Sequence, residues 1–134
     1  MLTTMDTVPK VVVIEDDEDE RVALGRILRI NGFAVSSYAS AEAFLQEAPT
    51  GLSCLLLDMH LEGMSGLELM RVLRGNGSVL PIIIITASDE PDSRVAAEQL
   101  GCLAYLRKPF QARALVEMIR SRLTDVAFRK NTLH

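Results

Sequence analysis

The chain has 134 residues, of which 49% are hydrophobic and 24% are charged, and its formal net charge at pH 7 is -4. This length and composition fit one globular domain with enough apolar residues for a core. The acidic balance argues against direct binding of nucleic acid, because such binding usually needs a basic patch.

The apolar runs of the sequence are too short to cross a membrane, and the first segment, MLTTMDTVPK, lacks the apolar core of an export signal. We therefore expect a cytoplasmic protein that does not insert into membranes. Cys54 and Cys102 lack the spacing of metal ligands, and in that compartment we expect both thiols to be reduced.

Short apolar runs typical of strands alternate along the chain with longer segments of helical periodicity. The pattern predicts five strands, at residues 11–14, 33–35, 52–57, 81–85 and 103–106. It predicts five helices, at residues 18–30, 40–48, 65–75, 91–100 and 110–123. Ser40 and Ser65 are suited to cap the second and third helices, and Glu68 completes a capping box with Ser65.

Five strands alternating with five helices indicate a parallel sheet covered on both faces, because crossovers between parallel strands need helices. The strand segments are continuously apolar, as strands buried on both faces are. We therefore expect an α/β fold, an open doubly wound flavodoxin-like domain with strand order 2-1-3-4-5. The domain is expected over residues 9–123, and residues 124–134 are expected to form a C-terminal tail or linker stub.

Polar residues follow four of the five predicted strands, at the edge where such folds collect functional groups. The first strand is followed by three consecutive acids, and the others lead into Asp58, Thr86 and Lys108. Asp58 ends an all-leucine run, and burying a carboxylate there is costly unless something pairs with it. Converging carboxylates repel one another, and Mg²⁺ together with a lysine removes that repulsion. The predicted pocket suits a phosphoryl group held beside a carboxylate.

The chain resembles the receiver domains of two-component response regulators over about residues 11–123. The segments that carry the resemblance are VVVIEDDEDERVALGRIL, LLLDMHLEGMSGLELM, PIIIITAS and AYLRKPF. Each segment alone is unspecific, whereas their joint pattern is specific. The segment NGFAVSSYASAEAFL looks most like the subgroup linked to nitrogen fixation and to LuxR-type regulators.

The resemblance implies that Asp58 accepts a phosphoryl group from a phosphohistidine on a sensor histidine kinase or phosphotransfer protein. It implies that Mg²⁺, with Mn²⁺ as a substitute, is held by Glu15, Asp16, Asp58 and the backbone carbonyl of His60. Asp17 is the alternative to one of the first two acids. The only catalysis implied is the domain's own phosphorylation and hydrolysis.

The same resemblance implies that Thr86 bonds a phosphoryl oxygen, that Lys108 pairs with the phosphoryl group, and that Tyr105 reorients when Thr86 moves. This movement would change the surface made by the fourth helix, fifth strand and fifth helix, where a downstream output domain, a target protein or a second phosphorylated copy would bind. The Lys108–Pro109 peptide is expected to be cis, which X-Pro bonds tolerate.

Two features depart from the family pattern. The family commonly has Met-Pro where this chain has Leu61-Glu62, and we expect a freer loop there with an extra acid near the site. His60 and Ser88 occupy variable positions beside the phosphoryl site, where side chains can gate attacking water. The side chain of His60 is a further candidate metal ligand.

Three other functions fit the fold class. A phosphatase of the haloacid dehalogenase type would need a second acid two residues after Asp58, where this chain has His60. A flavin or nucleotide module would need a glycine- or hydroxyl-rich phosphate loop after the first strand, where this chain has three acids. A receiver-shaped interaction domain that is never phosphorylated would have no need of Asp58, Thr86 and Lys108 together.

Overall fold

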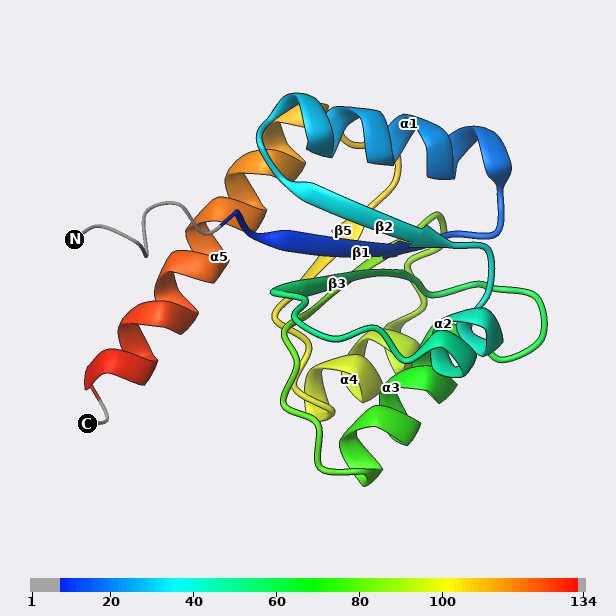
Figure 1. Ribbon diagram of the computed structural model, residues 1–134. Coiled ribbons are helices and arrows are strands. Elements are labelled where there is room, and N and C mark those ends of the chain that lie inside the picture. Colours follow the sequence, from blue (N-terminus) through cyan, green and yellow to red (C-terminus); the bar gives the residue numbers. More distant parts are fainter. Residues whose placement is uncertain (1–7, 133–134) are drawn as a thin grey trace.

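The predicted strands form one parallel sheet in the computed structural model, which describes residues 8–132 of the chain (Figure 1). The strands are β1 (Lys10–Ile14), β2 (Ala34–Tyr38), β3 (Cys54–Asp58), β4 (Ile82–Thr86) and β5 (Ala104–Arg107). The helices are α1 (Glu18–Ile30), α2 (Ala41–Glu47), α3 (Gly66–Gly75), α4 (Pro91–Gln99) and α5 (Ala112–Thr132). The sheet order is β2-β1-β3-β4-β5, so the predicted flavodoxin-like fold and strand order are confirmed.

Alternating strand residues supply two apolar cores, one on each face of the sheet, because successive side chains of a strand point to opposite faces. Val12 and Ile14 of β1 pack into the core that α2, α3 and α4 cover. Val11 and Val13 pack into the core that α1 and α5 cover. Figure 1 shows the same division, with α1 and α5 on one side of the sheet and the other helices below it.

Three of the helices are capped at their N-termini by a side chain. Asp17 accepts a hydrogen bond from the backbone N–H of Glu20 at the start of α1. Ser40 caps α2, and Ser65 forms the predicted reciprocal capping box with Glu68 at the start of α3. Such caps satisfy backbone donors that a helix leaves without partners. The two predicted serine caps are confirmed.

Most predicted boundaries agree with the structure within one or two residues, and those of β2 and α5 differ most. β2 runs from Ala34 to Tyr38 and not only to residue 35. Its continuation is Ser36-Ser37, which carries no apolar signal, and it lies at the edge of the sheet. α5 continues to Thr132, whereas an end at residue 123 was predicted. Most of the predicted tail is therefore helical, and residues 133–134 lie outside the described part of the chain.

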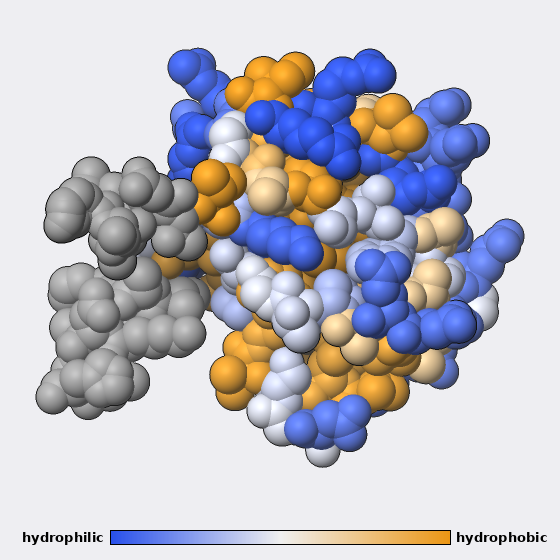
Figure 2. Space-filling view, viewed as in Figure 1, coloured by the Kyte–Doolittle hydropathy of each residue, from blue (hydrophilic) through white to orange (hydrophobic). Residues whose placement is uncertain are grey.

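Hydrophobic residues gather on the lower part of the face shown in Figure 2, and hydrophilic residues dominate towards the right, where the strands end. An apolar hollow on the molecule lies between α2, the segment that leads into β3, and the end of α3; it is lined by Phe44, Leu45, Ala48, Pro49, Leu52, Leu73, Ser78 and Leu80. Among residues 8–132, no helix has the length and apolar character needed to cross a membrane.

Candidate functional site

The carboxyl ends of four parallel strands bring the predicted polar residues to one edge of the sheet. Asp58 and Thr86 are the last residues of the neighbouring strands β3 and β4. Glu15 follows β1 directly, and Lys108 follows β5. Glu15 is 1% exposed and Asp58 is 4% exposed, because β1 and β3 lie in the interior of the sheet. The four strand ends therefore form one site.

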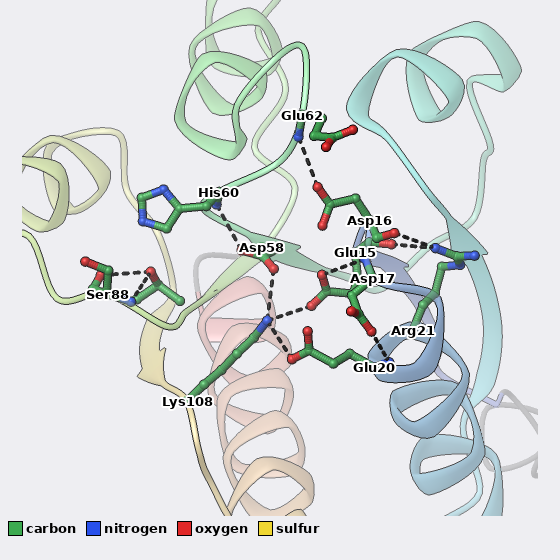
Figure 3. Close-up of polar contacts among 11 residues, drawn as sticks. Glu15, Asp16, Asp17, Glu20, Arg21, Asp58, His60, Glu62, Ser88 and Lys108 are labelled. Carbon is green, nitrogen blue, oxygen red and sulfur yellow. Dashed lines mark hydrogen bonds and ion pairs between the residues drawn. The ribbon is translucent and has the colours of Figure 1, made fainter.

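Lys108 joins the acids of this site. Its Nζ lies 2.7 Å from Oε1 of Glu15, 2.9 Å from Oδ2 of Asp58 and 3.0 Å from Oε1 of Glu20 (Figure 3). Burial works to lower the pKa of Lys108, but its hydrogen bonds to Glu15 and Asp58 outweigh burial and raise that pKa above its usual value. The ammonium group therefore stays charged and pairs with the two buried carboxylates, which would otherwise be costly to bury.

Glu15 shows that one lysine does not fully compensate the acids. Burial raises the pKa of its carboxyl from 4.5 to about 7; the hydrogen bond from Lys108 opposes this rise, and the neighbouring Asp58 adds to it. Close carboxylates disfavour each other's charged form. A cation bound beside Glu15 would favour its charged form and so oppose the rise of its pKa.

Glu15, Asp16 and Asp58 can each offer one carboxylate oxygen within 4.8 Å of the others. Such an all-oxygen cluster has the donor chemistry that Mg²⁺ prefers, and Mg²⁺ usually keeps several waters in addition. The residues present therefore fit the predicted ion. Asp17, the alternative ligand, is placed differently, because its carboxylate caps α1 through a 2.9 Å bond from the N–H of Glu20.

The β3–α3 loop, residues 59–65, is held by a series of backbone donors. The N–H of His60 donates to Oδ1 of Asp58 at 2.9 Å, and the N–H of Glu62 donates to Oδ2 of Asp16 at 3.1 Å. The N–H of Met64 donates to Oε2 of Glu42 on α2 at 2.8 Å. A proline at position 62 would lack the second donor. Glu62 therefore gives the loop a tether that proline would lack, and the expectation of a freer loop stays a prediction.

The side chain of His60 points away from the acidic cluster in Figure 3. Its Nε2 lies 3.4 Å from Oε1 of Glu90, at the start of α4. Within the described residues, the candidate metal cluster contains three carboxylates and not this imidazole. The site therefore offers no support for His60 as a side-chain ligand, while the role of its backbone carbonyl stays a prediction.

Thr86 and Tyr105, the predicted switch residues, lie on the neighbouring strands β4 and β5. The Thr86 hydroxyl donates to the carbonyl of Ser88 at 2.8 Å and accepts from its N–H at 3.2 Å. The Tyr105 hydroxyl is buried and has no hydrogen-bond partner among the described residues. The guanidinium of Arg94 lies 5.2 Å from the centre of the Tyr105 ring. The predicted cis peptide at Lys108–Pro109 is confirmed.

Sequence patterns did not identify several residues that shape the site. Glu20 completes the set of acids around Lys108, and Glu42 anchors the β3–α3 loop from another helix. Arg21 donates to the backbone carbonyl of Glu15 at 2.8 Å and so supports the turn after β1. All three are charged residues on helices, where a solvent-exposed role is the ordinary expectation. Only their tertiary contacts distinguish them.

A doubly wound parallel sheet with an acidic crevice at its carboxyl edge is the architecture of CheY-like domains of the flavodoxin-like fold. The family model of the response regulator receiver domain matches residues 11–120. The chain therefore belongs to the response regulator receiver domain family of two-component systems.

Similar proteins include transcriptional regulators and response regulators. Transcriptional regulatory protein FixJ of Azorhizobium caulinodans is 35% identical over 112 residues, which cover 83% of this chain and 53% of FixJ. Response regulator MprA of Mycobacterium tuberculosis is 36% identical over 115 residues, covering 85% of this chain and 50% of MprA. The chain thus spans about half the length of these curated relatives.

Solved structures of the family superimpose closely. The structure of FixJ-N matches with a TM-score of 0.80 and 34% identity, covering 88% of this chain and 95% of that one. The structure of response regulator StyR matches with a TM-score of 0.83 and 35% identity, covering 94% of this chain and 64% of that one.

Proposed function

We propose that Asp58 is the phosphoacceptor of this receiver domain. The proposal rests on the position of Asp58, the last residue of the central strand β3. Its carboxylate contacts the ammonium of Lys108 and lies beside the acids Glu15 and Asp16. One oxygen of Asp58 accepts the N–H of His60, and the other contacts Lys108. This arrangement fixes the carboxylate beside positive charge, as phosphoryl transfer requires.

The proposed reaction is a displacement at phosphorus. A carboxylate oxygen of Asp58 bonds to the phosphoryl group of a phosphohistidine, the nitrogen–phosphorus bond breaks, and the bond's electron pair stays on the imidazole nitrogen. Lys108 neutralises charge on the group that arrives. Glu15, Asp16, Asp58 and the backbone carbonyl of His60 would hold Mg²⁺, or Mn²⁺ in its place, and this ion would supply further positive charge. Hydrolysis by water breaks the oxygen–phosphorus bond to Asp58 and returns the carboxylate.

The proposed output is a change in the surface formed by α4, β5 and α5. A phosphoryl group adds about -1.5 to -2 charges and gives the hydroxyl of Thr86 a new acceptor. Thr86 then leaves its contacts with Ser88, and Tyr105 moves with it on the adjacent strand. The buried, unpaired hydroxyl of Tyr105 supports this step, because a polar group without a partner gains from a new position.

The proposed donors and targets follow from membership of the family. A sensor histidine kinase or phosphotransfer protein supplies the phosphoryl group in the cytoplasm, and an output domain, a target protein or a second phosphorylated copy reads the altered surface. The chain spans about half the length of its curated relatives. The partner that recognises the altered surface is either an output domain covalently attached to the receiver domain or a separate protein. The domain catalyses only its own phosphorylation and hydrolysis.

Intact-mass measurement after incubation with Mg²⁺ and acetyl phosphate tests the phosphoacceptor. We expect one phosphoryl increment that needs the metal and is absent from Asp58→Ala. Asp19→Asn, a change at an exposed acid of α1, should be phosphorylated like the unchanged chain. An unmodified chain under Mg²⁺ and Mn²⁺ alike would contradict the proposal and favour an interaction domain that is never phosphorylated.

A further inference from the structure

The hydroxyl of Thr86 is fully committed within its own loop. Thr86 is 0% exposed, and its single O–H donor is used by the carbonyl of Ser88 while an oxygen lone pair accepts the N–H of the same residue. A hydroxyl has only one hydrogen to donate. Thr86 therefore cannot donate to a group on Asp58 until the loop that begins at residue 87 releases it.

Side-chain contacts connect Ser88 to the β3–α3 loop on the other side of Asp58. Oγ of Ser88 lies 3.5 Å from Oε1 of Glu90, and the same Glu90 oxygen lies 3.4 Å from Nε2 of His60. The backbone N–H of His60 in turn donates to Asp58. A continuous series of polar contacts thus leads from Thr86, at the end of β4, to Asp58, at the end of β3.

We propose that the His60–Glu90 contact is a latch that holds the β4–α4 loop, residues 87–90, in the position that keeps the Thr86 hydroxyl on Ser88. The inference rests on the proposed function, in which Thr86 must turn towards Asp58. His60 and Glu90 are positioning residues in this account, since their side chains act on Thr86 through Ser88 and do not contact the reacting atoms; only the backbone N–H of His60 contacts Asp58.

The geometry suits a latch that opens. Both side chains are about half exposed, at 46% for His60 and 53% for Glu90, and their contact is long. Even between fully charged groups, contacts this exposed change an equilibrium by only about two- to fivefold. A phosphoryl group on Asp58 would offer Thr86 a charged acceptor, and charge-assisted hydrogen bonds are about twice as strong as neutral ones.

Hydrogen exchange of the Ser88 amide in the unphosphorylated chain tests the latch without any phosphoryl chemistry, because this amide donates to Thr86. We expect Glu90→Ala and His60→Ala each to lower its protection about two- to fivefold, and the double variant to lower it no further than one of them. Glu90→Gln keeps an acceptor oxygen and should stay close to the unchanged chain. Asp92→Ala removes an exposed acid on α4 and should have no effect.

The rate of Asp58 labelling by acetyl phosphate supplies the second measurement. The two alanine variants should be labelled about two- to fivefold faster, and Asp92→Ala should be labelled at the unchanged rate. Unchanged Ser88 protection in both alanine variants, or an equal change in Asp92→Ala, would overturn the latch. If Ser88 responds as expected and no chain is ever labelled, the latch stands and the phosphoacceptor proposal falls.

Discussion

The two loops that border Asp58 are held in different ways. The β3–α3 loop is tied at alternate residues by backbone donors to three carboxylates, with distances of 2.8–3.1 Å. The side chains of the proposed latch on the β4–α4 loop, His60, Ser88 and Glu90, make exposed contacts of 3.4 and 3.5 Å. Hydrogen bonds from backbone N–H groups to carboxylates are stronger than contacts between exposed side chains. The β3–α3 loop, beside the proposed metal ligands, is therefore the more firmly held of the two, and the β4–α4 loop, which follows Thr86, is the more weakly held.

Overpacking the close contact between the start of α3 and the end of β3 should have the largest effect. A Cβ at Gly66, the first residue of α3, would clash with the backbone carbonyl oxygen of Asp58. Because backbone must shift to relieve the clash, we expect Gly66→Ala to lower the free energy of unfolding by about 3 kcal/mol, measured by urea denaturation. Gly75→Ala is the matched control, since a Cβ at this end of α3 meets nothing within 4 Å. Equal stability of the two variants would contradict the expectation.

Adding Mg²⁺ should increase the difference in hydrogen-exchange protection between the β3–α3 and β4–α4 loops. At ten times its dissociation constant, an ion that binds only the folded chain stabilises it by about 1.4 kcal/mol. We expect a higher Tm and slower hydrogen exchange at the amides of His60 and Glu62, with little change at Ser88.

Two asparagine variants separate the candidate ligands for Mg²⁺. Asp16→Asn should lose most of the stabilisation by the ion. Asp17→Asn should keep it, because asparagine is also a good N-cap. The reverse result would assign the ion to Asp17.

The tether from α2 should contribute less. Glu42→Ala removes the acceptor of the Met64 N–H, and we expect a loss of about 1 kcal/mol in unfolding free energy together with faster exchange of the Met64 amide. Gln46→Ala changes an exposed residue of the same helix and should leave this amide protected. If the Met64 amide exchanges equally in both variants, the tether does not hold the loop.

Restoring the family's proline should have the smallest effect. Glu62→Pro removes the N–H that donates to Asp16, so the carboxylate loses a partner that orients it. We expect Mg²⁺ to bind several-fold more weakly, as measured by titration calorimetry. Glu62→Ala removes the same charge and keeps the N–H, so it should bind Mg²⁺ more tightly than Glu62→Pro. Identical affinities would show that the donor has no role.

The fold was predictable because each of its five strands contains or directly follows an apolar run, and parallel strands that end together place their following residues at one edge. That logic found Asp58, Thr86 and Lys108, together with the acids after β1. It could not find Glu42, because a helix acid reaches a loop only through the packing of α2 beside β3. The same limit applies to Thr86, whose place in the sequence says nothing about which way its hydroxyl turns.

The length of α5 has a mechanical consequence. Its first turns are fixed to the sheet by Leu115, Val116 and Ile119, which are almost fully buried, and the rest of the helix projects beyond the sheet (Figure 1). A helix of 21 residues is a rod about 31 Å long. Tilting the part beyond Ile119, which is about 20 Å long, by about 5° carries its far end through about 2 Å. An angular change too small to disturb the core is therefore amplified into a displacement the size of a hydrogen bond.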